Sequence, residues 1–233
     1  MTEENTIESF ALHLANRAYL YRMFHIALGA LPSTDLLRTL SSEEARAALR
    51  YLDGLIEGKD DAIRATIELF ESLQGKAEDP GCLEALRSSY TRLFLVPGDS
   101  RVIPWESPYI GKETMLFQES TLDVRARYAE HGFAASGEAH FPEDHIAMML
   151  DFLAHLSSRA YEAFADAQDA ELGRILAAQG SFLEAHILPW LPLFCEDLGH
   201  KDDRGFFFPI SQALLAWAQA DKAWLDSGAA RPL

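Results

Sequence analysis

The sequence has few basic residues and no long uninterrupted apolar run. Its 233 residues include 20 Lys and Arg against 36 Asp and Glu, which gives a formal net charge of −16 at pH 7. Nucleic-acid binding draws its affinity from clustered cations, so this balance argues against a nucleic-acid partner and favours a cationic one. No window reaches the roughly 18 consecutive apolar residues of a membrane-spanning helix, and we expect no stable membrane insertion.

Cysteine is also scarce. Cys82 and Cys195 are the two cysteines, and they lie far apart with no Cys-x-x-Cys spacing. Neither a disulfide framework nor a sulfur-rich metal site is therefore indicated, and a reducing compartment fits best. The first residues, MTEENTIESF, begin acidic, whereas a secretory signal needs a basic start followed by an unbroken apolar stretch. We expect a cytoplasmic protein.

Common catalytic motifs are missing as well. The sequence contains no Gly-x-Ser-x-Gly elbow and no glycine-rich phosphate loop, and neither cysteine has basic neighbours that would lower its pKa. Nucleophilic catalysis and binding of a phosphate in a glycine-rich loop are therefore not indicated, and we expect no cofactor.

The apolar residues that are present recur at helical spacing. With 48% hydrophobic residues, the chain can bury a sizeable core. In the first segment they return every three or four residues, which predicts a helix ending near Gly29. Ser33 and Ser41 are predicted N-caps, and Glu44 would complete a capping box with Ser41.

Later segments show the same periodicity. Apolar stripes predict helices within 63–73, 83–94, 113–132, 146–160 and 214–224. The stretch 170–198 is also helical but must kink or break at Pro189 and Pro192. No convincing strand alternation is present, so the predicted fold class is all-α, with about ten helices.

The domain organisation has two interpretations. In the first, residues 1–233 form one globular helical domain. In the second, two closely packed subdomains, 1–131 and 142–233, are joined by a hinge near 132–141, where Gly, Ser and Ala residues form a connector. Hinge loops allow copies of a chain to exchange elements. We therefore expect a monomer or a domain-swapped homodimer.

The stretch LVPGDSRVIPWESPYIG at 95–111 is the longest irregular segment predicted. It holds three prolines and two glycines and shows no sustained period. Long loops inside compact domains are often functional, so this segment is a candidate for a binding role.

The stretch FPEDHIAMMLDFLAHL at 141–156 places polar residues at the mouth of an apolar helix. Pro142 suits a first helical turn, because its missing N–H would be unpaired there, and Glu143 and Asp144 suit the positive end of the helix dipole. His145 is not explained in this way, since a cation gains nothing at a helix N-terminus. That residue points towards function.

The same helix also admits a metal site. Asp144, Asp151 and His155 fall on one helical face, and Asp151 and His155 at i, i+4 could ligate one ion. No second pair with ligand spacing is present elsewhere. A helical metal-binding protein or a metal-dependent hydrolase using these three residues therefore stays as an alternative.

Three stretches together resemble one family. They are YTRLFLVPGDSRVIPWESPYIG at 90–111, PEDHIAMMLDFLAHL at 142–156 and HILPWLPLF at 186–194. In order and spacing they resemble the TorD/DmsD-type cytoplasmic chaperones, the redox enzyme maturation proteins that include the more distant nitrate reductase delta subunits. The resemblance covers about residues 10–225.

The resemblance implies an all-helical chaperone without a catalytic role. Its partners would be the twin-arginine leader and the catalytic subunit of a molybdenum-cofactor oxidoreductase. The chaperone would aid cofactor insertion and proofread the leader, and it would permit Tat export only after the cofactor is loaded.

The resemblance also implies which residues bind the leader. They are Tyr90, Leu93, Phe94, Trp105, Glu106, Pro142, Asp144, His145 and Trp190. A leader with two arginines and an apolar stretch needs carboxylates beside an aromatic-lined groove, and this set supplies both. A subunit assembled permanently into a redox complex is the remaining alternative.

Overall fold

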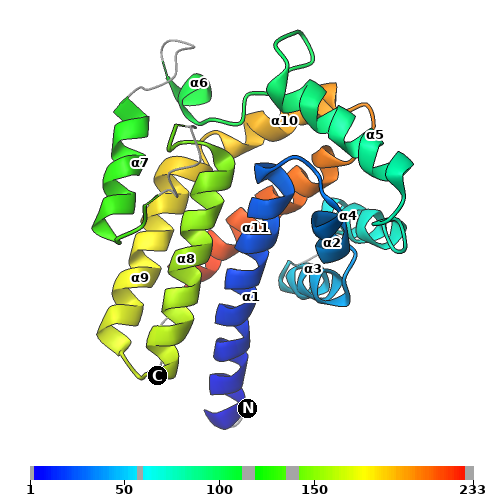
Figure 1. Ribbon diagram of the computed structural model, residues 1–233. Coiled ribbons are helices and arrows are strands. Elements are labelled where there is room, and N and C mark those ends of the chain that lie inside the picture. The colour runs from blue at the N-terminus through cyan, green and yellow to red at the C-terminus, as the bar shows by residue number, and fades with distance from the viewer. Residues whose placement is uncertain (1–2, 57–59, 112–118, 135–141, 229–233) are drawn as a thin grey trace.

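The computed structural model describes residues 3–56, 60–111, 119–134 and 142–228, and within them the chain is helical apart from turns, loops and one isolated β-bridge. The all-α prediction is confirmed. In chain order the elements are α1 (Glu3–Gly29), α2 (Thr34–Leu40), α3 (Glu43–Leu55), α4 (Asp61–Ser72), α5 (Pro80–Tyr90), the π-helix η1 (Thr91–Leu95), α6 (Ser107–Ile110), α7 (Glu119–Glu130), α8 (Ile146–Ala165), α9 (Asp169–Phe182), the π-helix η2 (Leu183–Ile187), α10 (Leu191–Lys201) and α11 (Phe207–Asp226) (Figure 1).

Helix α8 lies between α1 and α9, and it runs opposite to both of them (Figure 1). The apolar stripe predicted for this helix is confirmed, since Ile146, Leu150 and Leu153 are fully buried. Helix α11 packs against α4, α9 and α10. Elements from both ends of the chain therefore share one hydrophobic core.

The proposed hinge cannot be located in this arrangement, because residues 135–141 lie outside the described ones. Helix α1 contacts α8, and α4 contacts α11, so residues from 1–131 pack directly on residues from 142–233. The division into subdomains stays a prediction. None of the described helices combines the length and apolar content that crossing a membrane requires.

Serine side chains cap the first short helices. The Ser33 hydroxyl accepts a hydrogen bond from the Leu36 N–H at 3.1 Å, as predicted. Ser42 caps α3 by accepting from the Ala45 N–H at 3.2 Å. The prediction of Ser41 as that cap is wrong by one residue, because the Ser41 N–H closes α2 on the Leu37 carbonyl. Two adjacent serines therefore end one helix and begin the next.

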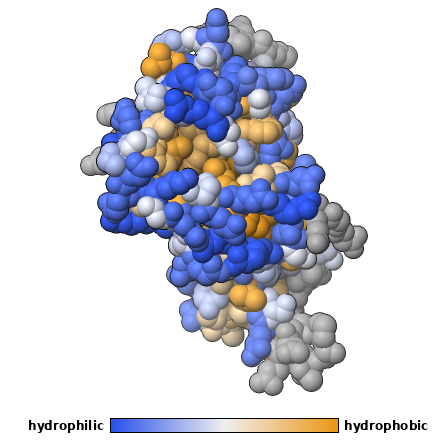
Figure 2. Space-filling view, turned by 90° about the vertical axis from the view of Figure 1, so that its right-hand side faces the viewer, coloured by the Kyte–Doolittle hydropathy of each residue, from blue (hydrophilic) through white to orange (hydrophobic). Residues whose placement is uncertain are grey.

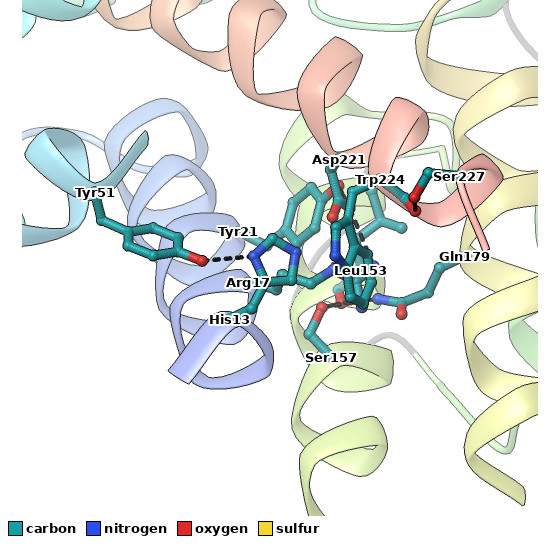
Figure 3. A network of polar contacts seen from close by, with 10 residues as sticks. All are labelled: His13, Arg17, Tyr21, Tyr51, Leu153, Ser157, Gln179, Asp221, Trp224 and Ser227. Carbon is teal, nitrogen blue, oxygen red and sulfur yellow. Dashed lines mark hydrogen bonds and ion pairs between the residues drawn. The ribbon is translucent and has the colours of Figure 1, made fainter. Parts of the chain in front are cut away.

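A buried ion pair joins α1 to α11 (Figure 3). Arg17 donates from Nε and Nη2 to the two carboxylate oxygens of Asp221, at 2.6 and 3.1 Å, and the Tyr21 hydroxyl donates to Oδ2 at 2.6 Å. Arg17, Tyr21 and Asp221 are all fully buried. Charges removed from water are tolerated when they are paired and hydrogen-bonded, so this network fixes the register of the two helices.

The helix predicted over 170–198 is interrupted, as expected from its two prolines. Helix α9 ends at Phe182, η2 follows it, and α10 begins at Leu191 with Pro192 in its first turn. Trp190 lies at the break, and its indole Nε1 donates to the His186 carbonyl at 2.6 Å. This bond stabilises the turn between the two helices.

Candidate functional site

Residues 96–111, which follow η1 and include the short helix α6, are called the 96–111 loop. This loop lies beside the chain that precedes α8. Residues Trp105 and His145 form an isolated antiparallel bridge. The Glu106 N–H donates to the Asp144 carbonyl at 3.1 Å, and the Ile146 N–H donates to the Pro104 carbonyl at 2.8 Å. The Trp105 and His145 rings also meet edge to face, with centroids 5.2 Å apart. Two stretches that the sequence analysis singled out separately therefore form one structural unit.

Helix α8 begins four residues later than predicted. Its first residue is Ile146, so Pro142, Glu143 and Asp144 precede the helix and do not form its first turn. That prediction is wrong because the backbone of Asp144 is paired with the 96–111 loop.

His145 is the N-cap of this helix. Its Nδ1 accepts a hydrogen bond from the Ala147 N–H at 3.1 Å. Burial, with a smaller contribution from His25, lowers the pKa of His145 to about 4, so the imidazole is neutral and can accept. The expectation that His145 is a cation is wrong, because the neutral imidazole caps the helix without a charge.

Asp144 is fully buried and only partly hydrogen-bonded. Its Oδ2 accepts from the Ser107 N–H at 2.9 Å, which holds the first residue of α6. Its Oδ1 has no hydrogen-bond partner among the described residues. Glu143 is engaged at the edge of the same unit, where its carboxylate accepts from Arg125 Nε at 2.7 Å.

A buried histidine connects the loop to η2. Nδ1 of His186 lies 3.2 Å from both carboxylate oxygens of Glu106, and Nε2 lies 2.9 Å from Oδ2 of Asp123. Burial lowers the pKa of His186, but the two carboxylates outweigh it and leave the pKa above its ordinary value. Burial raises the pKa of Glu106, and His186 opposes that rise. The arrangement favours an imidazolium held between two carboxylates.

Sequence reasoning missed the role of His186. Its partners stand 80 and 63 residues away along the chain. No local spacing carries such a signal, and the sequence singles out His186 only as the first residue of the stretch 186–194. Only the packing of the loop onto η2 brings the three groups together.

Aromatic side chains hold the far end of the loop. The ring of Tyr109 stacks on Trp190 with centroids 5.5 Å apart and an interplanar angle of 25°. The Tyr109 hydroxyl donates to Oδ2 of Asp197 at 3.0 Å. The loop is therefore anchored on α10 as well as on η2.

The beginning of the loop is fixed by η1. The Val102 N–H donates to the Leu93 carbonyl at 2.7 Å. Below it, Tyr90, Phe94 and Phe207 form an aromatic cluster with centroid separations of 5.0 to 5.8 Å. Single π-helical turns are rare and often mark functional sites, and both described ones contact this loop.

All the residues predicted to bind a leader are buried. Tyr90, Leu93, Phe94, Trp105, Glu106, Pro142, Asp144, His145 and Trp190 share this property. Tyr90, Leu93 and Phe94 lie in or next to η1, and the others belong to the 96–111 loop or to the segments that contact it. In this arrangement they position the loop and have little contact with solvent. Their role in leader binding stays a prediction.

The residues of the metal alternative do not assemble. Asp151 forms an ion pair with Arg22 at 2.7 Å, and the His155 ring lies 5.6 Å from that of Phe133. Asp144 precedes the helix, so it does not share the helical face predicted for the three residues. In the described part of the chain, no group of three His, Cys, Asp or Glu side chains could hold an ion.

Comparison with known proteins finds one family and a set of similar chains. The family described as nitrate reductase delta subunit matches residues 44–196. The chaperone protein TorD of Vibrio parahaemolyticus is 26% identical over 210 residues, which cover 90% of this chain and 94% of that protein. TorD of Vibrio cholerae is 30% identical over 198 residues, covering 84% and 85%. TorD of Aliivibrio fischeri is 28% identical over 211 residues, covering 90% and 94%.

Proposed function

The chain belongs to the nitrate reductase delta subunit family and is of the TorD type, and from this membership we propose that it is a maturation chaperone for a redox enzyme. Its client is the catalytic subunit of a molybdenum-cofactor oxidoreductase. The chaperone binds the twin-arginine leader of that subunit, or its cofactor-free body, in the cytoplasm until the cofactor is inserted. Release then permits export.

One structural observation carries the assignment of this activity to a particular region. Two stretches far from it in the sequence, 142–156 and 186–194, converge on the 96–111 loop. A loop held by buried polar contacts on a rigid helical scaffold is typical of binding sites.

The overall charge supports the kind of partner. A formal charge of −16 attracts a cationic peptide and speeds its encounter with the protein. A twin-arginine leader supplies such charge next to an apolar stretch. The relatives are named as chaperones, which agrees with a binding function that involves no bond-making chemistry.

A leader titration tests this function. The probe is a fluorescein-labelled synthetic leader from the oxidoreductase gene beside the gene of this chain, together with a copy in which both arginines are glutamine. We expect saturable binding of the first peptide and at least about tenfold weaker binding of the second, because guanidinium groups form paired hydrogen bonds with carboxylates.

The same titration tests the predicted residues. Trp105→Ala, Asp144→Ala and His145→Ala remove side chains that fix the 96–111 loop, so each variant should bind the leader more weakly than the wild type. Circular dichroism and thermal unfolding identify variants that have lost the fold. Unchanged affinity in all three folded variants would remove these residues from the site, and no binding by the wild type would overturn the function.

A further inference from the structure

Helix α7 lies at the edge of the molecule, on the side opposite to α4 and α5 (Figure 1). Figure 2 views the α4 and α5 side, where hydrophilic residues surround smaller hydrophobic areas, so α7 belongs to the far side. The second half of α7 is held by Tyr128, whose buried ring lies 4.7 Å from that of Phe152 in α8 and 6.1 Å from that of Phe182 in α9. Its hydroxyl also donates to the Glu143 carbonyl at 2.9 Å.

The first half of α7 is attached in a different way. Val124 is fully buried, and Thr121 is buried with a hydroxyl that has no hydrogen-bond partner among the described residues. Oδ2 of Asp123 lies 2.9 Å from Nε2 of His186 in η2. The polar attachment of this half to η2 therefore passes through the His186 ring.

This ring faces a carboxylate at each nitrogen. Nδ1 lies 3.2 Å from both oxygens of Glu106, and Nε2 lies against Asp123. A carboxylate only accepts hydrogen bonds, and a neutral imidazole has one N–H. Both contacts are hydrogen bonds only while the three groups share two protons, either both on the ring or one on the ring and one on Glu106. Loss of one proton leaves two acceptors facing each other at one nitrogen.

Burial determines which of the two contacts is lost. Glu106 is fully buried, and a buried carboxylate without a donor is costly. The Asp123 side chain is 50% exposed, and Nε of Arg127 lies 3.8 Å from its Oδ2. Water and Arg127 can therefore replace the imidazole at Asp123, whereas nothing comparable is present at Glu106 among the described residues.

The surrounding charged groups do not supply the missing proton. Two pairs flank the cluster, Arg125 with Glu143 and Glu184 with Lys222 of α11. Burial, followed by the neighbouring carboxylates Asp144 and Glu143, raises the pKa of Tyr128 well above its ordinary value, so its hydroxyl keeps its proton. Asp144 lies near Glu106 and adds negative charge, which favours retention of a proton by the cluster.

We propose that Glu106, His186 and Asp123 form a proton-dependent latch, in which loss of one proton releases Asp123 and the first turns of α7 while the 96–111 loop stays bound. Burial lowers the pKa of His186, but the two carboxylates outweigh it and leave the pKa above its ordinary value. The latch is therefore closed at pH 6.5 and opens as the pH rises through the folded pKa. It belongs to the fold itself and does not depend on which client is bound.

NMR spectroscopy between pH 6 and 9 tests the latch. Histidine labelled with ¹⁵N reports the protonation of His186. Amide exchange, expressed as protection factors to remove its intrinsic pH dependence, reports local opening. As His186 loses its proton, protection of the Val124 and Arg125 amides should fall about tenfold, because one charge-assisted hydrogen bond is lost. The amides of residue 106 and Tyr128 should stay within about twofold.

Asp123→Asn separates the latch from a purely structural contact. The asparagine amide can donate to a neutral imidazole, and its oxygen can accept from a charged one, so the contact survives in both states. Protection of α7 should then be independent of pH, and His186 should lose its proton at lower pH than in the wild type. Asp123 is half exposed, so the variant should fold. Glu130→Gln removes another carboxylate of α7, 4.0 Å from Arg127, and should behave like the wild type.

Three results would overturn the latch. The first is constant protection of α7 while His186 loses its proton, or an equal fall in Asp123→Asn and the wild type. The second is loss of protection at residue 106 and Ile146 in place of α7, since the loop would then be the released element. The third is a His186 that keeps its proton up to pH 9, because α7 would never be released.

Discussion

At the scale of single residues, buried polar side chains determine how the loop and helices are held. His145 acts through a neutral imidazole nitrogen, and Asp144 and Glu106 act through carboxylates removed from water. Polar groups in such places are costly unless they are hydrogen-bonded, so their partners define the structure around them. The effects of changing them follow from the identity of those partners.

His145 makes the fold sensitive to acid. Its pKa is lowered to about 4 by burial, whereas an unfolded histidine titrates near 6.5, so between these values the unfolded chain binds a proton that the native one excludes. Stability therefore falls with decreasing pH by up to about 1.4 kcal/mol per pH unit from this residue. His145→Asn keeps a capping acceptor and should reduce that dependence between pH 6 and 4.5, as measured by urea unfolding.

Two comparisons make the acid test specific. His13, whose pKa burial also lowers to about 4, continues to contribute in the variant, so the dependence becomes shallower but does not vanish. The exposed His200 is the control for the substitution itself, because His200→Asn makes the same change at the surface. An unaltered dependence in His145→Asn would show that His145 is protonated in the folded protein.

Among the described residues, Asp221 supplies the carboxylate that pairs with Arg17 between α1 and α11. Asp221→Ala leaves the buried Arg17 cation without its partner, and we expect a loss of about 3 to 5 kcal/mol in unfolding free energy. Asp151→Ala breaks the more exposed pair with Arg22 and should cost less than about 1 kcal/mol. Equal losses in thermal and urea unfolding would contradict the distinction between buried and exposed pairs.

At the scale of elements, the close approach of α1 and α8 sets a steric limit. A Cβ atom built on Gly29 would lie 2.8 Å from Cβ of Ala147, which is too short for two carbon atoms. Gly29→Ala should therefore separate the helices and cost about 1 to 3 kcal/mol. Gly173, within α9, has no atom within 4 Å of such a Cβ, and Gly173→Ala should stabilise the fold by up to about 1 kcal/mol.

The loop and η2 form a second element-scale contact, through Glu106 and His186. Because the pKa of His186 is raised, its imidazolium is present below pH 6.5 and its stabilising contribution is lost as pH rises through the folded pKa. Glu106→Gln removes the charge of its partner. At pH 6 it should speed hydrogen exchange of the residue 106 and Ile146 amides about 10- to 100-fold.

Asp123 supplies the control for that experiment. It contacts the other nitrogen of His186, but its side chain is 50% exposed, so solvent weakens its interaction. Asp123→Asn should raise exchange of the same amides less than Glu106→Gln does. The reverse order would show that the exposed carboxylate holds the loop.

The presence of a helix could be predicted from the sequence where a long apolar stripe decides it, as in α8 and α11. The residues at which helices begin and end were harder to predict. Ser41 and Ser42 are equivalent as capping residues, and only the end of α2 assigns one to each helix. The start of α8 was missed because a backbone contact with residues 104–106, distant in sequence, outweighs the local preference of Pro142 for a first turn.

At the scale of the whole molecule, the family and the all-helical fold followed from motif order and periodicity. The arrangement of the site did not. His186 meets Glu106 only through tertiary packing, and the burial of Trp105 follows from its contact with His145 and not from its position in a loop. The exposure of Leu31 and Val96 has no sequence signature, because single exposed aliphatic residues are common on protein surfaces.

The function that we propose requires the chaperone to distinguish an immature client from a mature one. Differential affinity for the two states is what such a role requires, since a protein that binds both equally shifts nothing between them. The client oxidoreductase subunit, prepared with its leader in cofactor-free and in cofactor-loaded form, provides both states.

Calorimetric titration of this chain against those two forms tests the central claim most directly. The account predicts binding of the cofactor-free subunit at least about tenfold tighter than binding of the loaded one. Equal affinity for both forms, or binding to neither, would contradict it.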